Sequence, residues 1–326
     1  MKIGQTTSRQ IGKQMFAAES KNLCRRVVGE NVWLSRENVE IEKVFARPTI
    51  EPYKFEVLET EEAVGRAMLE ELKTVTREKS GDAAMILLGG RGAQAMFRQI
   101  NRAIPTVGLD EMLARLHVFT QDALAPLKMN NGLSFVRDFE RLLGAEFFRR
   151  VKSFTPMQTD TENLENEMVK YLEKLDALGG IDLFFLGLGP EANAASHLAY
   201  IKPDSGATRS DVAGIIPISQ TILEHHIGKF KAGGSEISET DEAETRRATH
   251  ILTLAPAAIL SAKRVVQSIV DASTAPAKRE SFRRVLDTEI SADLEIRARQ
   301  LDENPGLWLR LHGNVRTLVL PDLLEA

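Results

Sequence analysis

The stretch "AAMILLGGRGAQAMFRQINRAI", residues 83–104, contains the pattern from which the fold is predicted. Its first part is a short, continuous apolar run, which is typical of a strand buried on both faces of a parallel sheet. The run ends in Gly89 and Gly90, and the apolar residues after them recur at helical spacing. A buried strand, a glycine turn and a helix in this order predict one strand–helix unit of an α/β protein.

The same alternation continues on both sides of this unit, from residue 53 to the end of the sequence. Apolar runs predict further strands at 54–58, 115–122, 181–189, 214–219, 267–273 and 314–321. Helical spacing predicts helices at 61–79, 132–151, 162–180 and 276–287. Thr60 is the expected N-cap of the first of these helices. We therefore expect an α/β fold with an open, mostly parallel sheet that carries helices on both faces, in a Rossmann-like arrangement.

Residues 1–52 have a different character from the rest of the chain. They are polar and mixed, and they end in a segment where Pro48 and Pro52 interrupt any helix or strand. Apolar residues such as Trp33 are more frequent there than in disordered segments. We predict an N-terminal extension with one or two helices that packs on a main domain formed by residues 53–326.

Composition argues against several classes of partner. Lys and Arg number 42 and Asp and Glu 46, so the net charge of −4 creates no global attraction to nucleic acid or anionic lipid. Cys24 is the single cysteine, which excludes an intrachain disulfide and suits a reducing compartment. No segment approaches about 18 uninterrupted apolar residues, and the N-terminus lacks a signal-peptide pattern. We expect a soluble, cytoplasmic protein that binds neither nucleic acid nor membrane.

The residues that follow each predicted strand are the candidate ligand-binding residues, because open α/β sheets bind ligands beyond the carboxyl ends of their strands. After the first strand, Gly89, Gly90 and Gly92 allow backbone N–H groups to approach an anion, and Arg91 adds a cation. A tight turn without any ligand explains the same glycines equally well.

Acidic and polar residues follow two further strands. Asp122 stands where it can act as a base towards a ligand, although an aspartate that caps a helix would look the same. Glu191, Asn193 and His197 follow the most apolar strand. If residues 191–200 begin a helix, Asn193 and His197 lie one turn apart on one face. The alternative is that Asn193 bonds locally while His197 packs or faces solvent.

A basic pair, Lys278 and Arg279, follows another predicted strand, where a helix begins. A lysine at that position works against the helix dipole, and a bound anion would offset this cost. A solvated basic face is the alternative explanation. Taken together, the strand ends predict a pocket for a small phosphorylated ligand.

Five segments in this order resemble the glucosamine-6-phosphate deaminase/isomerase and 6-phosphogluconolactonase family, over roughly residues 54–326. The segments are "LLGGRGAQAMFRQI", "VFTQDALAPL", "DLFFLGLGPEANAASHLAY", "PAKRESFRRVL" and "PGLWLRLHGNVRTLVLPDLL". The resemblance implies the sugar-phosphate isomerase/CoA-transferase-like version of the α/β fold and a small phosphorylated sugar as ligand. It implies no metal or organic cofactor.

The resemblance also implies which residues bind the phosphate. Gly90, Arg91 and Gly92, which follow Gly89, fall on the family's phosphate loop, where Arg91 and Gly92 replace a serine and a threonine. Arg209 resembles the arginine that follows the catalytic loop in deaminases. Lys278 resembles the phosphate-binding lysine.

The acid–base residues implied by the resemblance are altered in part. Asp122 falls on the acid that moves a proton between sugar carbons in deaminases. Glu191 and Asn193 fall on the aspartate and histidine of the catalytic loop, which includes Gly189. Asparagine does not exchange a proton near neutral pH as imidazole does, and loss of a general acid–base group typically costs about 10²–10⁴-fold in rate. His197 is the nearest replacement.

Three functions remain open on this basis. The first is a divergent sugar-phosphate isomerase or deaminase, in which Asp122 transfers a proton between C1 and C2. The second is a 6-phosphogluconolactonase-type hydrolase, which needs a base in place of the missing histidine. The third is a sugar-phosphate-binding protein without turnover. We expect an enzyme, with His225 and His226 as further candidates for the lost base. The sequence leaves a homo-oligomer open.

Overall fold

The structure is a computed structural model that describes residues 13–15, 23–36, 53–105, 109–190 and 196–325. Within these residues, seven strands form a parallel sheet in the order β4-β15-β14-β9-β5-β6-β8. The strands are β4 (Phe55–Val57), β15 (Val315–Val319), β14 (Arg264–Ile269), β9 (Leu183–Leu186), β5 (Ala83–Leu87), β6 (Leu116–Thr120) and β8 (Ser153–Thr155). The predicted open parallel sheet is confirmed.

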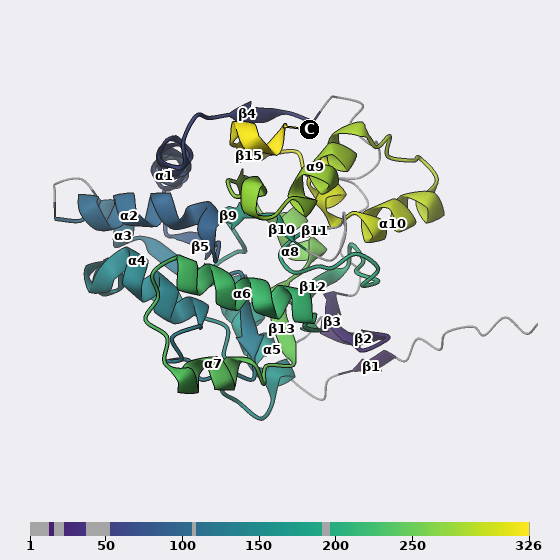
Figure 1. The fold of residues 1–326 in the computed structure, drawn as a ribbon, viewed down its shortest axis with the longest axis horizontal. Coiled ribbons are helices and arrows are strands. Elements are labelled where there is room, and N and C mark those ends of the chain that lie inside the picture. Colours follow the sequence, from purple (N-terminus) through teal and green to yellow (C-terminus); the bar gives the residue numbers. More distant parts are fainter. Residues whose placement is uncertain (1–12, 16–22, 37–52, 106–108, 191–195, 326) are drawn as a thin grey trace, which may run out of the picture.

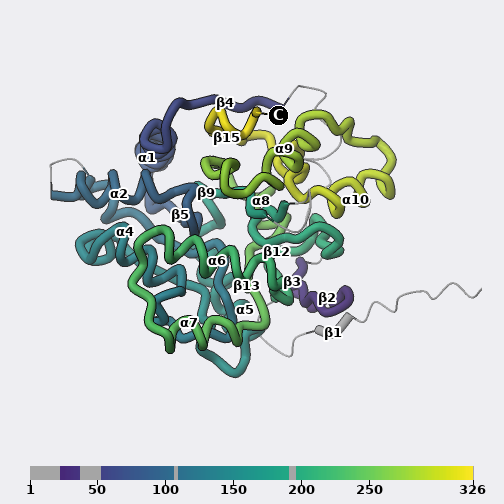
Figure 2. The backbone as a smooth tube through the Cα atoms, in the orientation of Figure 1, coloured from purple at the N-terminus to yellow at the C-terminus, as the bar shows by residue number. Residues whose placement is uncertain are grey.

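The strand order reverses between β5 and β9, at the centre of this sheet. From β5 the chain continues to β6 and β8 on one side, and from β9 it continues to β14 and β15 on the other. Figure 2 shows the blue segments around α1 and α2 on the left and the yellow-green segments around α9 and α10 on the upper right, with β5 and β9 between them. The loops that follow β5 and β9 therefore diverge, which opens a crevice at this edge.

Helices cover one face of the parallel sheet. Because successive strand residues point to opposite faces, Met85 and Leu87 pack in one core cluster while Ala84 and Ile86 pack in another. The helices on the first face are α1 (Glu61–Glu78), α2 (Gln94–Ala103), α3 (Asp110–Leu113), α4 (Phe135–Arg150) and α6 (Gln220–Ala232). The predicted cap of α1 is confirmed, since the Thr60 side chain accepts a hydrogen bond from the Ala63 N–H.

The other face packs against α5 (Leu164–Ala177), α8 (Pro256–Ser261) and a second sheet. This sheet is antiparallel, in the order β1-β2-β3-β12-β13-β7. Its strands are β1 (Lys13–Met15), β2 (Leu23–Val28), β3 (Asn31–Arg36), β12 (Asp211–Pro217), β13 (His250–Leu254) and β7 (Asp122–Ala125). Helices do lie on both faces of the parallel sheet, as predicted, but the sequence did not predict the second sheet.

The helices expected in residues 1–52 are not found in the described part of that segment. Residues 23–36 instead form a β-hairpin of β2 and β3, and β3 also pairs with β12, far along the sequence. Trp33 is fully buried in the core between the sheets. Arg26 forms an ion pair with the buried carboxylate of Asp211, which also accepts a hydrogen bond from Ser35. These long-range partners favour a strand where local sequence does not. A domain boundary at residue 52 remains a prediction.

The remaining elements lie outside the two large sheets. They are α7 (Glu239–Thr245), α9 (Ala277–Asp287), α10 (Leu294–Glu303), the strand pair β10 (Gly189–Pro190) and β11 (Ser196–His197), and the short 3-10 helices η2 (Arg91–Ala93), η3 (Ala272–Thr274), η4 (Pro305–Leu311) and η5 (Pro321–Leu323). In Figure 1, α6 and α9 lie on either side of the region that contains β9, β10 and β11. Within the described ranges, no helix is long and apolar enough to cross a membrane.

Two local expectations near the crevice are wrong. Ser196 and His197 form β11, which pairs with β10, so they do not continue a helix through residues 191–200. Asp122 begins β7 and pairs with Thr253 of β13, so it does not cap a helix. In both places the chain pairs with a strand distant in sequence, and this pairing overrides the local pattern.

Candidate active site

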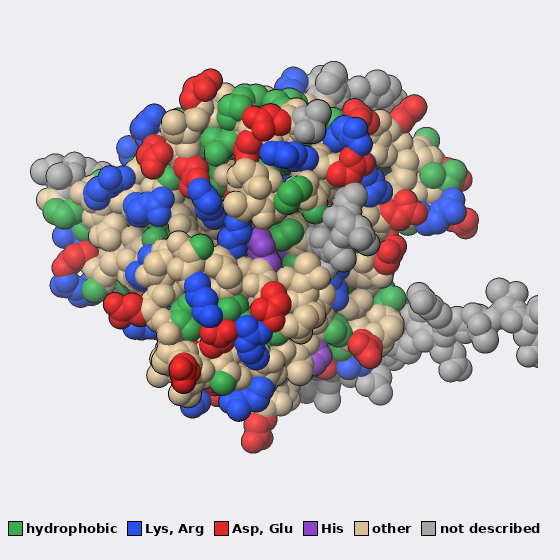
Figure 3. Space-filling model, in the orientation of Figure 1, with side chains coloured by type: hydrophobic (Ala, Val, Ile, Leu, Met, Phe, Trp, Pro, Cys, Tyr) green, Lys and Arg blue, Asp and Glu red, His purple; other side chains and the backbone are tan. Residues whose placement is uncertain are grey.

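A single cavity lies at the crevice between the diverging loops. Its walls are Leu88–Gly92 after β5, Gln121 and Asp122 after β6, Gly187–Pro190 after β9, and Ser268 and Asp271 at the end of β14, with further side chains from β11, α6 and α9. In Figure 3, histidine atoms (purple) and Lys or Arg atoms (blue) are visible in a hollow near the centre of the face. The site therefore lies beyond the carboxyl ends of the parallel strands, as the fold predicts.

Most of the predicted site residues meet in this cavity. The lining includes Gly89, Gly90, Arg91, Gly92, Asp122, Gly189, His197 and Lys278. Arg209 is exposed, in the segment before β12, and is not among the residues that line the cavity. Glu191 and Asn193 lie outside the described residues. The roles of all these residues remain predictions.

Asp122 is a buried acid at one wall of the cavity. The chain leaves β6 at Thr120 and enters β7 at Asp122, so Asp122 stands where the chain passes from the parallel to the antiparallel sheet. Burial raises the pKa of Asp122 to about 7, although a hydrogen bond from Gln121 Nε2 to Oδ2 (2.5 Å) opposes the rise. A carboxyl group with a pKa near 7 can take up and return a proton at neutral pH.

His197 is held in one orientation by its neighbours. Its Nδ1 accepts a hydrogen bond from the Tyr200 N–H (3.2 Å), and its ring stacks on the Tyr200 ring at a centroid distance of 4.2 Å. Burial lowers the pKa of His197 far below its usual value, and the charge of Lys278 lowers it further. The imidazole is therefore neutral near pH 7, and because Nδ1 accepts, its proton lies on Nε2.

Gly189 is the residue that allows this histidine position. A Cβ atom added at Gly189 would lie 1.8 Å from Cε1 and 2.0 Å from Nε2 of His197. No side chain fits in that space. The second glycine of the Gly-x-Gly pattern after β9 is therefore required because the His197 ring lies directly against the backbone of β10.

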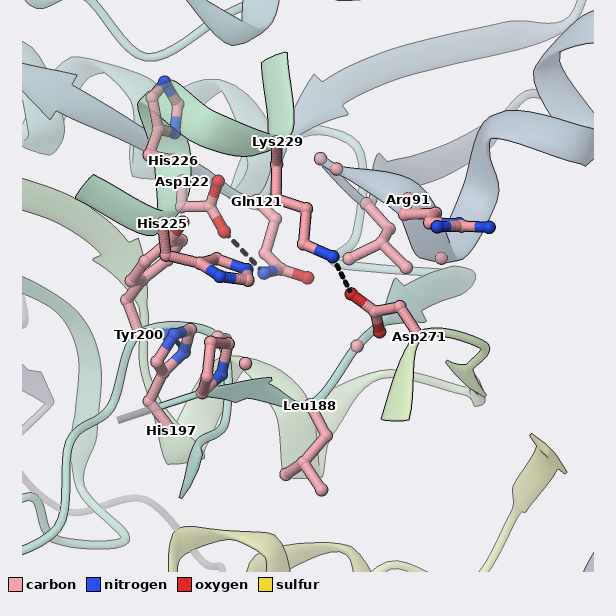
Figure 4. A pocket seen from close by; sticks show the side chains of 18 of the residues that line it. Arg91, Gln121, Asp122, Leu188, His197, Tyr200, His225, His226, Lys229 and Asp271 are labelled. Atoms are coloured by element: carbon pink, nitrogen blue, oxygen red, sulfur yellow. Dashed lines mark hydrogen bonds and ion pairs between the residues drawn. The ribbon is translucent and has the colours of Figure 1, made fainter. Parts of the chain in front are cut away.

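The two consecutive histidines of α6 have different environments. His225 lines the cavity, and burial together with the charges of Lys278 and Lys229 lowers its pKa to about 4. His226 packs between Phe135 and Phe230, and its Nε2 lies 2.7 Å from the carbonyl oxygen of Leu133. Burial lowers the pKa of His226 to about 4 as well. His226 also borders the cavity, but in Figure 4 its ring points away from His225 and His197.

Two lysines and an aspartate form a charged group at the opposite wall. Lys278 of α9 is buried and paired with the Asp271 carboxylate. Lys229 of α6 places its Nζ 3.4 Å from Asp271 Oδ2 and donates to Thr274 Oγ1 at 2.5 Å (Figure 4). Burial lowers the pKa of Lys278, although its partner Asp271 opposes this change. Burial alone would raise the pKa of Asp271. The charges of Lys278 and Lys229 outweigh that effect and hold the pKa of Asp271 below its usual value. The group carries net positive charge.

Arg91 is part of the cavity wall, but its guanidinium group points out of the cavity (Figure 4). The guanidinium forms an ion pair with Glu61 (2.5 Å), and 43% of the side chain is exposed. Figure 4 shows it turned away from the centre of the cavity. The loop itself comes close to its surroundings, since a Cβ atom at Gly89 would lie 2.4 Å from the Phe135 ring, and Gly90 has a φ of +75°. The glycines of this loop are therefore required by packing and by backbone conformation.

Gln121, Lys229 and Asp271 are among the cavity residues that sequence reasoning did not single out. Asp271 follows β14 as Asp122 follows β6, so the strand-end rule would have found it. Lys229 stands four residues after His225, which places both on one face of α6, but nothing local indicates that α6 borders the cavity. Within the described residues, no group of three or more His, Cys, Asp and Glu side chains could hold a metal ion.

Comparison with known proteins gives a weak match in sequence. No family model matches the chain. The glucosamine-6-phosphate deaminase of Staphylococcus epidermidis is 22% identical over 211 residues, which cover 64% of this chain and 74% of that protein.

Solved structures match over more of the chain. A monomeric glucosamine-6-phosphate deaminase has a TM-score of 0.63 at 20% identity and covers 83% of this chain and 98% of its own. The 6-phosphogluconolactonase from Trypanosoma cruzi has a TM-score of 0.59 at 13% identity, with coverage of 84% and 96%. The enzyme of the same name from Trypanosoma brucei has a TM-score of 0.58 at 16% identity, with coverage of 84% and 97%. The chain thus has the α/β fold that glucosamine-6-phosphate deaminases and 6-phosphogluconolactonases share, in agreement with the resemblance of its sequence to them.

Proposed function

We propose that the protein is a sugar-phosphate isomerase or deaminase that moves a proton between adjacent carbons of an open-chain sugar phosphate. The observation that carries this proposal is the composition of one cavity. A buried carboxyl group with a pKa near 7, Asp122, lines the same cavity as the ammonium groups of Lys229 and Lys278 and the glycine loop that follows β5. Such a cavity combines an acid–base group with a binding place for an anion.

The phosphate group would bind at the wall with the lysines. Ammonium groups are strong donors to phosphate oxygens, and successive backbone N–H groups in a glycine-rich turn favour anions. Asp271 neutralises part of the lysine charge, so this wall attracts a phosphate without holding two unpaired cations in the empty protein. Arg209 is left out of this proposal because it does not line the cavity.

The proton transfer would use Asp122. Its carboxylate takes the proton from the carbon next to the sugar carbonyl, the C–H electron pair forms a carbon–carbon double bond, and the carbonyl π pair moves onto oxygen. The electron pair of the carbon–carbon double bond then takes that proton back from Asp122 at the former carbonyl carbon. The hydroxyl group on the other carbon gives its proton to the charged oxygen, and its oxygen forms the new carbonyl group. His197 and His225 are neutral near pH 7, so each can donate an N–H to the oxygen that gains charge.

Hydrolysis of a lactone is the less favoured reaction. It requires a base that removes a proton from water, and the neutral imidazole of His225, with a pKa of about 4, is a weak base. Asp122 is the stronger base in the cavity, and its buried position suits proton transfer to and from a bound carbon acid. The proton-transfer reaction is therefore the one that the site supports best.

The decisive experiment follows solvent deuterium. The protein is incubated in D₂O with glucosamine 6-phosphate, fructose 6-phosphate or 6-phosphogluconolactone, and NMR detects deuterium at C1 or C2 of the sugars and hydrolysis of the lactone. Asp122→Asn is expected to lower the exchange rate by about 10²–10⁴-fold. Asp160→Asn, an exposed acid outside the cavity, is the matched control and should leave it unchanged.

The rate of exchange should also rise with pH up to about 7 and then level off, because the carboxylate form of Asp122 is the base. Exchange that is undiminished in Asp122→Asn contradicts the proposal. Hydrolysis of the lactone without any exchange identifies a lactonase. Binding of the sugar phosphates with neither reaction identifies a binding protein.

A further inference from the structure

Gln121 has a polar atom without a hydrogen-bond partner in the part of the chain that the structure describes. The residue stands between β6 and β7, lines the cavity, and is only 3% exposed. Its amide nitrogen donates to Asp122 Oδ2 at 2.5 Å. Its amide oxygen, Oε1, is buried and has no hydrogen-bond partner among the described residues. Figure 4 shows this oxygen turned away from Asp122, towards the open centre of the cavity.

The orientation of this amide is fixed by its neighbour. The ionised form of Asp122, which acts as the base, requires a hydrogen-bond donor beside it. If the amide turned over, its oxygen and the Asp122 carboxylate would be two acceptors at hydrogen-bond distance with no proton between them. With Asp122 ionised, the donor end of the amide therefore faces Asp122 and the acceptor end faces the cavity. A buried acceptor without a partner is costly, so such atoms in native proteins call for a specific partner.

A ligand is the natural partner, because the atom faces the cavity that the proposed substrate would occupy. We propose that Gln121 selects sugar phosphates that carry a hydrogen-bond donor, a hydroxyl or an ammonium group, on C2. This inference rests on the proposed function, since it takes Asp122 as the group that acts at C1 and C2. The Gln121 side chain is hydrogen-bonded to the Asp122 carboxylate. Its amide oxygen is therefore close enough to contact substituents on the carbons between which Asp122 would transfer the proton.

The proposal assigns to Gln121 more than support of Asp122. Support through the amide nitrogen alone would change the pKa of Asp122 and so affect every ligand in the same way. Selection through the amide oxygen affects only ligands that carry a donor at C2, because an analogue without the donor leaves the oxygen unpaired in the complex. The ratio of affinities for two such ligands separates the two roles.

The experiment measures binding of unreactive, open-chain ligands by titration calorimetry. The three ligands are glucitol 6-phosphate, 2-amino-2-deoxyglucitol 6-phosphate and 2-deoxyglucitol 6-phosphate, which carry a hydroxyl, an ammonium and a hydrogen at C2. None has a carbonyl group, so none can react. We expect the intact protein to bind the first two at least about 10-fold more tightly than the third.

Gln121→Met keeps the length of the side chain and removes both polar atoms. We expect the affinity ratio to fall to about 1 in this variant, mainly because the two donor-bearing ligands bind less tightly. Gln158→Met changes an exposed glutamine outside the cavity and should keep the ratio of the unmodified protein. Gln121→Glu offers a second variant: its added negative charge should increase the preference for the ammonium ligand over the hydroxyl ligand.

The outcomes are distinct. Equal affinity of the unmodified protein for all three ligands overturns the role of Gln121 and leaves the proposed function intact. A ratio that is preserved in Gln121→Met also overturns it. Failure of every ligand to bind the unmodified protein overturns the proposed function and the role of Gln121 together. The measurement on the unmodified protein decides the matter even where a variant does not fold.

Discussion

Asp122 illustrates how a reactive residue reduces the stability of the fold. Its pKa of about 7 in the folded protein is far above the ordinary value of 3.8. Between these two values the folded state binds a proton that the unfolded state has released, so the stability contributed by this group is full at low pH and is lost as the pH rises through 7. The same property that makes Asp122 a base at neutral pH therefore weakens the fold there.

This reasoning predicts a pH-dependent gain of stability in Asp122→Asn. A shift of about three units corresponds to roughly 4 kcal/mol, so the variant should be more stable than the unmodified protein by up to about 4 kcal/mol at pH 8. The gain should shrink as the pH falls and nearly disappear at pH 4. Urea unfolding at pH 8, 6 and 4 measures it. A gain that stays constant across this range would show that ionisation of Asp122 is not its cause.

Gly189 and Gly228 offer a matched pair of glycine substitutions. Gly189→Ala places a methyl group within 2.0 Å of the His197 ring, so the ring must move, at a cost of about 1–3 kcal/mol and with a loss of activity. Gly228→Ala on α6 meets no atom within 4 Å and should stabilise the protein by about 0.5–1 kcal/mol. Thermal unfolding and the deuterium-exchange rate test both variants. Normal activity in Gly189→Ala would mean that the position of His197 does not matter for the reaction.

At the scale of elements, α6 divides its two faces between the cavity and the core. His225 and Lys229 are four residues apart and line the cavity, whereas Ile222, Leu223 and Ile227 join the core cluster beneath. A movement of this helix would therefore change the cavity and the core together. The helix is fixed partly by His226, whose ring packs edge-to-face against Phe135 of α4 and whose Nε2 lies 2.7 Å from the carbonyl oxygen of Leu133.

The pKa of His226 predicts how the anchoring of α6 depends on pH. Its value of about 4 in the folded state lies below the ordinary 6.5, so its contribution is full above pH 6.5 and is lost as the pH falls towards 4. His226→Gln should destabilise the protein at pH 8 through lost ring packing. That deficit should shrink by about 2 kcal/mol at pH 5, where the unmodified protein must keep a neutral imidazole. Urea unfolding of both proteins at the two pH values measures the change, and a deficit that grows at pH 5 would contradict it.

Local sequence patterns were sufficient to predict the elements that are determined by residues close to them in the sequence. The cap of α1 at Thr60 and the apolar runs of β5 and β9 are encoded within about twenty residues, and the structure confirms them. The pattern fails for β7, a four-residue strand that follows β6 without a turn signal. It fails also for the hairpin of β2 and β3, because the acids that pair with Arg25 and Arg26 lie 140 and 185 residues away.

The candidate site could be predicted to a similar extent. Because parallel strands end at one edge, the strand-end rule brings together Asp122, Lys278 and the glycine loop without any knowledge of the structure. It cannot show that Arg91 turns to Glu61, or that α6 brings Lys229 to Asp271. Those contacts depend on how helices pack across the sheet, and a single sequence does not record that packing.

At the scale of the whole molecule, the hairpin of β2 and β3 forms part of the core. Trp33 and Leu34 are fully buried and close the cluster between the two sheets. Arg26 and Asp211 join the hairpin to β12 through a pair in which the aspartate side chain is 0% exposed and the arginine 14%. The stability of the main body therefore depends on a segment that precedes it in sequence.

Adjacent arginines of the hairpin test this dependence. Arg26→Gln removes the cationic partner of the buried Asp211 carboxylate, which keeps only the hydrogen bonds from Ser35 and Thr208. This substitution should destabilise the protein by about 3–5 kcal/mol. Arg25→Gln removes a pair with Glu165 in which both side chains are 28% exposed, and should cost less than about 1 kcal/mol. Urea unfolding compares them. Equal effects of the two substitutions would mean that the hairpin contributes no more to stability than a surface element does.

Each large sheet contains a pair of neighbouring strands that lie far apart in the sequence. β3 pairs with β12, and β4, at residues 55–57, pairs with β15, at residues 315–319, beside which it lies in Figure 1. During translation, β3 and β4 leave the ribosome long before their partner strands β12 and β15 have been synthesised. Neither sheet can close during most of translation, and the early strands wait with unpaired edges. The unpaired edges of β3 and β4 are therefore exposed to aggregation until β12 and β15 have been made, and contacts between such distant segments are expected to slow folding.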